Sequence, residues 1–188
     1  MIDSEILPTI KGERICLRGL NDKDVNALFS IFSDPKVMEY WSSLPLEDLR
    51  AAQELLAVIR DGFQKQILFQ WGISRYIDDT VIGTCTLYHI DARNRRAEIG
   101  YALGSKYWRN GYMLEALTLL LNYCFNSLNF HRLEADIDPN NTSSIKMVER
   151  LGFQKEGYLR ERWLVGGGTQ DTVLYGLLKN DWLNSHRD

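Results

Sequence analysis

The chain has 188 residues, of which 45% are hydrophobic, and its 22 basic and 25 acidic residues give a formal net charge of −3. This composition suits one domain, residues 1–188, with a full hydrophobic core. No basic block, signal peptide or long apolar run stands out, which argues against direct nucleic-acid binding, secretion and membrane insertion.

The sulfur and imidazole side chains predict no metal site. The three cysteines, far apart and set among apolar residues, are Cys16, Cys85 and Cys124. This pattern indicates buried thiols in a reducing compartment, so we expect a cytoplasmic protein without a disulfide framework. The three histidines share no ligand spacing with the cysteines or with one another, and they are His89, His131 and His186.

The N-terminal part predicts a strand followed by helices. Residues 14–17 form the strand, and Asn21 with Asp24 three residues later is a capping pattern that starts a helix ending near Phe32. Two further helices are expected, a short one that starts at Asp34-Pro35 and an amphipathic one within residues 47–66.

The middle of the chain predicts an antiparallel meander and a crossover. β-branched and aromatic residues are too frequent for a helix in three successive stretches, which are residues 67–76, 81–90 and 96–103. A helix from Gly111 to about Asn126 and a strand over residues 132–138 then form a crossover unit that returns to the sheet.

The C-terminal part predicts one more helix and a hairpin. Asn141 is a good N-cap residue, and Gly152 stands where a left-handed residue ends the helix. The strands of the hairpin, residues 153–165 and 169–179, flank Gly166, Gly167 and Gly168. Together these elements predict an α/β fold with a mixed, mostly antiparallel sheet flanked by helices.

The segment 107–116 joins a predicted strand to the long helix and offers an anion-binding turn. Free backbone N–H groups and the positive end of the helix dipole favour an anion, and Gly111 lets a phosphate approach without a Cβ in the way. Arg109 adds a planar charged group and Asn110 a neutral donor. The pattern is neither a Walker loop nor a dinucleotide fingerprint, which argues against nucleotide hydrolysis. By itself it fits a pyrophosphate site and a solvated turn equally well.

Taken in order, the motifs resemble the GCN5-related N-acetyltransferase (GNAT) superfamily, in particular the RimJ and RimL type of ribosomal-protein N-terminal acetyltransferases. The resemblance covers nearly the whole chain. It is carried by residues 14–18, 97–101, 108–113 with Glu115-Ala116, 132–135, Asn141 and Ser144 ahead of 149–153, and 171–178 before Trp182. It implies a single GNAT-type domain in which the strands holding Glu98 and Glu134 splay apart and admit a pantetheine arm.

The resemblance implies acetyl-CoA as the co-substrate, with its diphosphate over the Gly111 turn. The residues that it implies for cofactor binding are Tyr101, Ala102, Leu103, Trp108, Arg109, Asn110, Gly111, Tyr112, Met113, Asn141 and Ser144. Trp108 and Met113 depart from the usual superfamily pattern. We expect Met113 to narrow the turn slightly and binding to survive, because the backbone donors do not depend on side-chain identity.

Glu98 and Ser144 are the predicted catalytic residues. Glu98 is the one carboxylate on its face of the strand 96–103, where the family favours a general base acting on a neutral amine. The alternative for Glu98 is an ion pair with Arg95, Arg96 or another cation. Ser144, or else a tyrosine, would donate a hydrogen bond to the leaving thiolate, and the alternative is that Ser144 only caps its helix. Direct attack in a ternary complex is more economical than an acyl-cysteine route.

The acceptor amine is the least determined feature. A peptide α-amino group has a pKa of about 7.8 against about 10.4 for lysine, so its neutral form is easier to reach near pH 7. This favours the N-terminus of a protein, while polyamines, amino sugars and amino acids remain the small-molecule alternatives. The family builds acceptor walls at residues 34–43, with Tyr40 and Trp41, and at residues 163–170. A non-catalytic acyl-CoA-binding module would lack Glu98 and Ser144, and a homodimer is left open.

Overall fold

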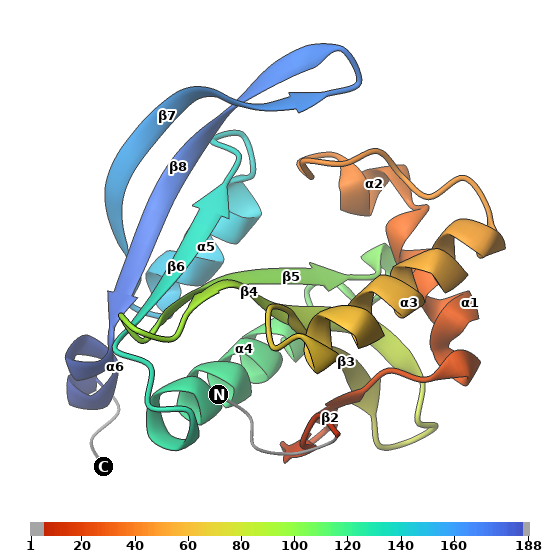
Figure 1. Cartoon of the computed structure of the whole chain (residues 1–188), viewed down its shortest axis with the longest axis horizontal. Coiled ribbons are helices and arrows are strands. Elements are labelled where there is room, and N and C mark those ends of the chain that lie inside the picture. The colour runs from red at the N-terminus through yellow and green to blue at the C-terminus, as the bar shows by residue number, and fades with distance from the viewer. Residues whose placement is uncertain (1–5, 186–188) are drawn as a thin grey trace.

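The computed structural model describes residues 6–185 of the chain. His186, one of the histidines named above, lies outside the described residues. One sheet of eight strands runs through the described part, in the order β1-β2-β3-β4-β5-β6-β8-β7, and helices cover both of its faces (Figure 1).

The helices and strands occur in the predicted order along the chain, with bounds close to the predicted ones. The strands are β1 (Ile10–Lys11), β2 (Ile15–Gly19), β3 (Phe69–Arg75), β4 (Val81–Asp91), β5 (Arg96–Leu103), β6 (Arg132–Ile137), β7 (Gln154–Val165) and β8 (Gly168–Leu178). The α-helices are α1 (Val25–Phe32), α2 (Pro35–Met38), α3 (Leu49–Gln64), α4 (Tyr112–Asn122), α5 (Thr142–Arg150) and α6 (Lys179–Ser185).

The strand pairing confirms a mixed, mostly antiparallel sheet. Within the described residues the neighbouring strands are antiparallel except β5 and β6, which pair in parallel. The long connection between β5 and β6 contains α4, which gives the predicted crossover (Figure 1). A crossover is needed there because a tight turn cannot join parallel strands.

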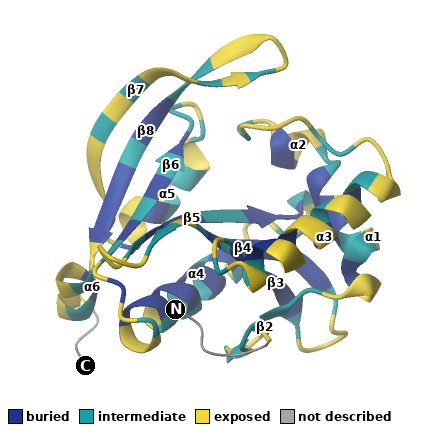
Figure 2. Ribbon diagram, in the orientation of Figure 1, coloured by how far each residue is buried: buried dark blue, intermediate teal, exposed yellow. Residues whose placement is uncertain are grey.

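Two apolar clusters pack on opposite faces of the sheet. The larger one joins the strands to α4, and Ala97, Ile99 and Leu103 of β5 belong to it. The smaller one joins α1, α2 and α3 to the other face, where Ala102 lies. The alternation predicted for β5 is therefore correct, and the buried residues follow the inner surfaces of the helices in Figure 2. Glu98 lies on the face opposite α4.

The predicted capping residues at one helix start and one helix end are confirmed. Asn21 Oδ1 accepts from Lys23 N at 3.0 Å while Asp24 Oδ2 accepts from Asn21 N at 2.9 Å, which is a reciprocal capping box. Gly152 has a φ of 90° after α5, the left-handed conformation that favours glycine.

Three features differ from the sequence prediction. The two-residue strand β1 is too short to leave a periodic pattern, and α6 contributes the buried Trp182 to the core. The long helix leaves α geometry at Asn122 and continues as a π-helical turn over Tyr123–Ser127. Apolar spacing does not distinguish a single π turn from the α-helix that precedes it.

Candidate active site

The expected splay between the two central strands is present. β5 and β6 pair through only three positions, residues 96–98 against residues 132–134. Beyond this contact, residues 99–101 and 135–138 line a cleft. Among the described residues the two strands have no further pairing with each other, so the sheet opens where the short parallel contact ends.

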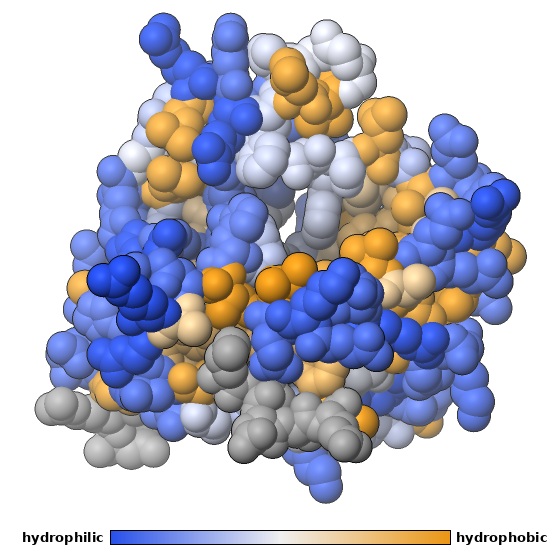
Figure 3. Space-filling model, viewed as in Figure 1, coloured by the Kyte–Doolittle hydropathy of each residue, from blue (hydrophilic) through white to orange (hydrophobic). Residues whose placement is uncertain are grey.

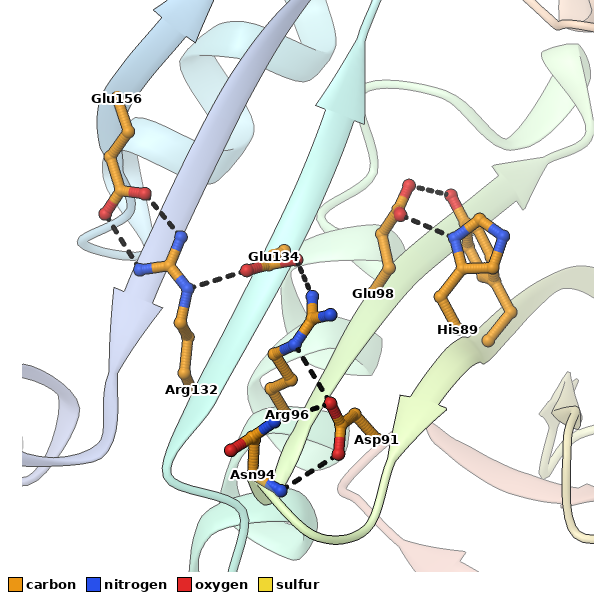
Figure 4. A network of polar contacts seen from close by, with 9 residues as sticks. His89, Asp91, Asn94, Arg96, Glu98, Arg132, Glu134 and Glu156 are labelled. Carbon is orange, nitrogen blue, oxygen red and sulfur yellow. Dashed lines mark hydrogen bonds and ion pairs between the residues drawn. The ribbon is translucent and has the colours of Figure 1, made fainter.

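An ion-pair network ties β5 to β6 at the base of the cleft (Figure 4). Arg96 Nη1 lies 3.0 Å from Glu134 Oε2, and Arg132 Nε lies 2.8 Å from Glu134 Oε1. Arg96 Nε also lies 3.6 Å from Asp91 Oδ2, and Arg132 pairs with Glu156. The network thus joins both ends of the short contact between the two strands.

Glu98 contacts Tyr88 and His89 instead of an arginine. Its Oε1 accepts a hydrogen bond of 2.5 Å from the Tyr88 hydroxyl, and its Oε2 lies 2.9 Å from His89 Nδ1. No arginine or lysine in the described chain pairs with Glu98, so the expected ion pair with Arg95 or Arg96 is absent, and the other cation of that alternative is His89 when its imidazole is protonated. The Glu98 side chain is 11% exposed and that of His89 is 60% exposed. His89 therefore links a buried carboxylate to solvent.

A bulge in β4 brings two consecutive residues to Glu98. Tyr88 lies directly opposite Glu98, and the register between β4 and β5 shifts between Tyr88 and Asp91. At this irregularity His89 takes a left-handed φ of 49°. Neighbouring side chains of a regular strand point to opposite faces, so only the bulge allows both to contact one carboxylate. Nothing in the local sequence marks this bulge, and the sequence analysis misses both residues.

Tyr88 stays protonated and donates to Glu98. Burial raises the pKa of the Tyr88 phenol far above its usual range, and the negative charges of Glu98 and Asp136 raise it further. The ring lies over Gly100, where an added Cβ would be 3.2 Å from Tyr88 Cε1. A side chain at position 100 would therefore push against the ring that orients Glu98.

Aromatic and acidic side chains form the outer walls of the cleft. They include Tyr40, Trp41, Asp136, Trp163 and Asp171. The walls expected at residues 34–43 and 163–170 thus face each other across one space. The tip of the β7–β8 hairpin reaches over it, since a Cβ added to Gly166 would lie 3.5 Å from Leu44 Cδ2. Figure 3 shows the surface hollowed below this tip.

The start of α5 presents Asn141 and Ser144 to the cleft. Asn141 Oδ1 accepts from Ser144 N at 3.1 Å and from Ser143 Oγ at 2.9 Å, so Asn141 caps the helix as predicted. Because Asn141 makes the cap, the alternative role of Ser144 as the cap is wrong. The Tyr101 hydroxyl donates to Ser144 O at 3.4 Å, and burial raises the pKa of Tyr101 to about 12.

The Gly111 turn has the backbone shape of an anion site. Gly111 has a φ of 78° at the N-cap of α4, and Arg109 has a φ of 61° two residues earlier. Both residues are exposed, so the turn is open to a ligand. Asn110 Nδ2 donates to Trp108 O at 2.9 Å and to Tyr107 O at 3.2 Å. This amide shapes the turn and is not the free donor that the sequence suggests.

Arg14 and Glu115 hold the turn from below. Glu115 Oε1 accepts from the backbone N–H groups of Glu13 and Arg14, and its Oε2 accepts from Arg14 Nε, each at 2.9 Å. Arg14 Nη1 donates in turn to Asn110 O at 2.9 Å, inside the anion turn. Gly12 lets the chain come this close, because an added Cβ would lie 2.8 Å from Glu115 Oε1. The two residues appear in the family motifs, but their contact spans about a hundred positions and leaves no local signal.

The other predicted cofactor residues occupy the end of β5 and the start of α4. Ala102 and Leu103 are buried, and Trp108 Nε1 donates to Leu103 O at 2.7 Å. The Arg14 guanidinium lies 4.8 Å from the centre of the Tyr112 ring. Met113 is buried in the main core, so the expectation that it narrows the turn is wrong. Its side chain faces the sheet, and only its backbone borders the turn.

Three further features of the described part are its cysteines, its potential metal ligands and the hydropathy of its helices. The three cysteines are free and buried. Within residues 6–185 no group of three or more histidine, cysteine, aspartate or glutamate side chains is placed to hold a metal ion. No helix in the same range combines the length and apolar character that crossing a membrane requires.

Comparisons with known proteins agree with this geometry. Residues 14–154 match the acetyltransferase (GNAT) domain. The chain is 38% identical over 176 residues to the uncharacterized N-acetyltransferase p20 of Bacillus licheniformis, covering 94% of this chain and 99% of that protein. It is 28% identical over 177 residues to the ribosomal protein uS5-alanine N-acetyltransferase of Escherichia coli (strain K12), covering 90% of each.

A solved structure shares the fold. The spermidine N-acetyltransferase from Vibrio cholerae, in complex with CoA and spermine, superposes with a TM-score of 0.81. The alignment covers 92% of this chain and 100% of that chain at 22% identity. This likeness supports the architecture. The two proteins whose names include an acceptor differ in it, because one is named for an alanine of ribosomal protein uS5 and the other for spermidine.

The Arg14–Glu115 contact predicts how stability depends on pH. Burial pushes the pKa of Glu115 up, but the hydrogen bonds and positive charge of Arg14 outweigh it and hold the pKa below its usual value. A carboxyl group whose folded pKa is depressed stabilises the fold above the unfolded pKa of about 4.3 and loses this effect as pH falls through the folded value. We expect Glu115→Gln to lower the free energy of unfolding at pH 7 by about 2 kcal/mol.

Urea denaturation at several pH values measures this effect. The difference between Glu115→Gln and the parent protein should shrink below pH of about 4. Glu54→Gln, which breaks an exposed pair with Arg50 on α3, is the control and should cost less than about 0.5 kcal/mol. Equal losses for the two variants would contradict a structural role for Glu115.

Proposed function

Because the chain belongs to the GNAT family and is an acetyl-CoA-dependent N-acetyltransferase, we propose that it acetylates the N-terminal α-amino group of a protein, with Glu98 as the general base. The observation that carries the proposal is the position of Glu98. This buried carboxylate stands at the point where β5 and β6 part, and the Tyr88 phenol and the His89 imidazole hold it, with no arginine or lysine partner among the described residues. A carboxylate that no arginine or lysine holds is available to accept a proton.

In this proposal acetyl-CoA runs from the Gly111 turn into the splay. The backbone N–H groups at the start of α4 and the Arg109 guanidinium bind the diphosphate. The pantetheine arm follows the unpaired side of β5, and Asn141 binds one of its amides through Nδ2, since its Oδ1 is already used in the cap. The residues present fit this co-substrate because the turn is open and the strand edge is free.

The reaction needs a neutral amine beside the thioester. The acceptor nitrogen attacks the acetyl carbonyl carbon, its proton passes to Glu98 directly or through a water, and the C–S bond breaks. His89 offers the proton a route to solvent, because its Nδ1 touches Glu98 and its side chain is mostly exposed. The coenzyme A thiolate has an intrinsic pKa of about 8.5, so one hydrogen bond from Ser144 or Tyr101 is enough help.

The cysteines support direct attack over an acyl-cysteine route. Burial raises the pKa of the Cys85 and Cys124 thiols, and Cys16 is also buried with a raised pKa. A thiol nucleophile must be accessible and ionised. These three are neither, so positioning of two substrates in one complex carries the rate acceleration.

The choice of acceptor rests on energetics and on one relative. A neutral α-amine is easier to reach near pH 7 than a neutral lysine, and a 28% identical relative is named as an alanine N-acetyltransferase of a ribosomal protein. A small polyamine is the second candidate. It is favoured by the carboxylates of Asp136, Asp138 and Asp171, which line the same cleft.

Labelled acetyl-CoA tests the acceptor directly. We expect the purified protein to label peptides at their N-termini in a panel that also contains polyamines, amino sugars and free amino acids. The same peptides with a blocked N-terminus are the control. Labelling of small amines alone would refute the proposed acceptor.

Replacement of Glu98 tests the base. We expect Glu98→Gln to lower kcat roughly 100-fold or more, because an amide cannot take the proton, with the affinity for acetyl-CoA unchanged. The acidic limb of the pH–rate profile should disappear with the carboxylate. Glu156→Gln, at the far end of the ion-pair network, is the control. An unaltered pH–rate profile in Glu98→Gln would remove Glu98 as the base.

Replacement of Arg109 tests the diphosphate site. We expect Arg109→Ala to weaken coenzyme A binding about tenfold, the loss of one charge-assisted contact, while kcat at saturating acetyl-CoA is kept. Isothermal titration calorimetry measures the affinity. Lys106→Ala removes a nearby cation that lies 5.0 Å from the centre of the Tyr107 ring, and it should bind normally. Equal affinities for all three proteins would contradict the site.

A further inference from the structure

Asp136 is a buried carboxylate in the cleft that the proposed chemistry does not use. It lies on β6 two residues beyond Glu134, the last residue that pairs with β5. Its side chain is 8% exposed, and it lines the cleft together with Tyr88 and Trp163. A carboxylate taken out of water is costly to the fold unless partners compensate it.

Only one oxygen of Asp136 is well satisfied. Oδ1 accepts from the Thr172 hydroxyl and from Trp163 Nε1, the latter at 3.3 Å. Oδ2 has no hydrogen bond to any described residue. Arg162 Nε lies 3.7 Å from Oδ2, beyond hydrogen-bond length, and its partly exposed guanidinium lies 5.3 Å from the centre of the Trp163 ring. Arg162 is therefore close enough to balance the charge of Asp136, but Oδ2 still lacks a hydrogen-bond donor.

The position of Asp136 separates it from the reacting centre. Two residues of strand carry it about 7 Å along β6 from the level of Glu98. The reacting nitrogen must be neutral at Glu98, and a second carboxylate beside that nitrogen would favour its charged form. Asp136 thus suits a different group of the acceptor, one that stays positively charged.

We propose that Asp136 binds a second cationic group of the acceptor, which takes the place of Arg162. This inference rests on the acceptor cleft of the proposed function and names its substrate class, a primary amine that carries a second positive charge. A protein N-terminus followed by a lysine or arginine has this chemistry, and so has an aliphatic polyamine. The aromatic rings of Tyr40, Trp41 and Trp163 suit the same cation through their π faces.

The backbone places Arg162 where it can move aside. The pairing of β7 with β8 is irregular between Leu159 and Trp163, and Glu161 has a left-handed φ of 51° there. This irregularity brings Arg162 and Trp163 to Asp136. Because the Arg162 side chain is partly exposed, its guanidinium can move from the carboxylate into solvent.

Matched acceptors and an isosteric variant test the inference. The acceptor pairs are Ala-Lys against Ala-Gln peptides, and 1,4-diaminobutane against butylamine. Each pair differs in one positive charge, and the two pairs distinguish a peptide source from a polyamine source. We expect the parent protein to prefer the more positive member of the accepted pair by about tenfold in kcat/KM.

Asp136→Asn should abolish that preference. The new side chain keeps an oxygen for Thr172 and Trp163, so the fold is retained, while the charge is lost. We expect KM for the cationic acceptor to rise about tenfold, with kcat and the KM for acetyl-CoA little changed. Asp181→Asn, on α6 away from the cleft in Figure 1, changes the net charge equally and should have no effect.

Arg162→Gln distinguishes a binding role from a structural ion pair. If Arg162 covers the cation site, its removal lowers KM for the cationic acceptor, opposite to Asp136→Asn. A structural pair would instead lower the Tm in both variants and leave the preference unchanged, which would overturn the inference. A parent protein that acetylates both members of each pair equally would also overturn it while leaving the N-acetyltransferase activity intact. Failure to label any amine would count against the proposed function itself.

Discussion

The three-residue parallel contact between β5 and β6 is the constraint on which the rest of the site depends. Elsewhere in the described chain the neighbouring strands pair antiparallel, and here the sheet opens immediately after Glu98 and Glu134. The arginine–glutamate network fastens the contact at its base, so the strands can part above it without separating altogether. A longer contact would close the cleft, and a shorter one would leave Glu98 without a fixed neighbour on β6.

The anion turn depends on a second long-range restraint, which ties it to the N-terminal strands. Arg14 reaches both the Glu115 carboxylate and the carbonyl oxygen of Asn110, so one side chain links β2 to the turn and to the first helical turn of α4. A left-handed residue other than glycine, here Arg109, is costly for an unsupported loop. The Glu115 carboxylate and Arg14 therefore help to hold the backbone of the turn in this conformation.

Local features of this fold are predictable from the sequence, and contacts between distant segments are not. The elements, the Gly111 turn and Glu98 are identified by local signals, which are the capping box at Asn21, the left-handed glycines, the alternation in β5 and the family motifs. The family comparison confirms the superfamily. The bulge at His89 and the register that places Tyr88 opposite Glu98 depend on strand pairing. Met113 shows the same limit, because only the packing of α4 decides that its side chain faces the core.

Two carboxylates on one face of the sheet, Glu98 and Asp136, have environments suited to different tasks. Glu98 is held by a phenol that stays protonated and by an imidazole open to solvent, so a proton can both reach it and leave it. Asp136 is fixed through one oxygen and has a partly exposed arginine beside the other, an arrangement that suits a cation. The negative charges of Glu98 and Asp136 both raise the pKa of the Tyr88 phenol, which is a further reason for it to remain a hydrogen-bond donor. An acceptor that spans the two carboxylates would be held at its charged end while its reacting end gives up a proton.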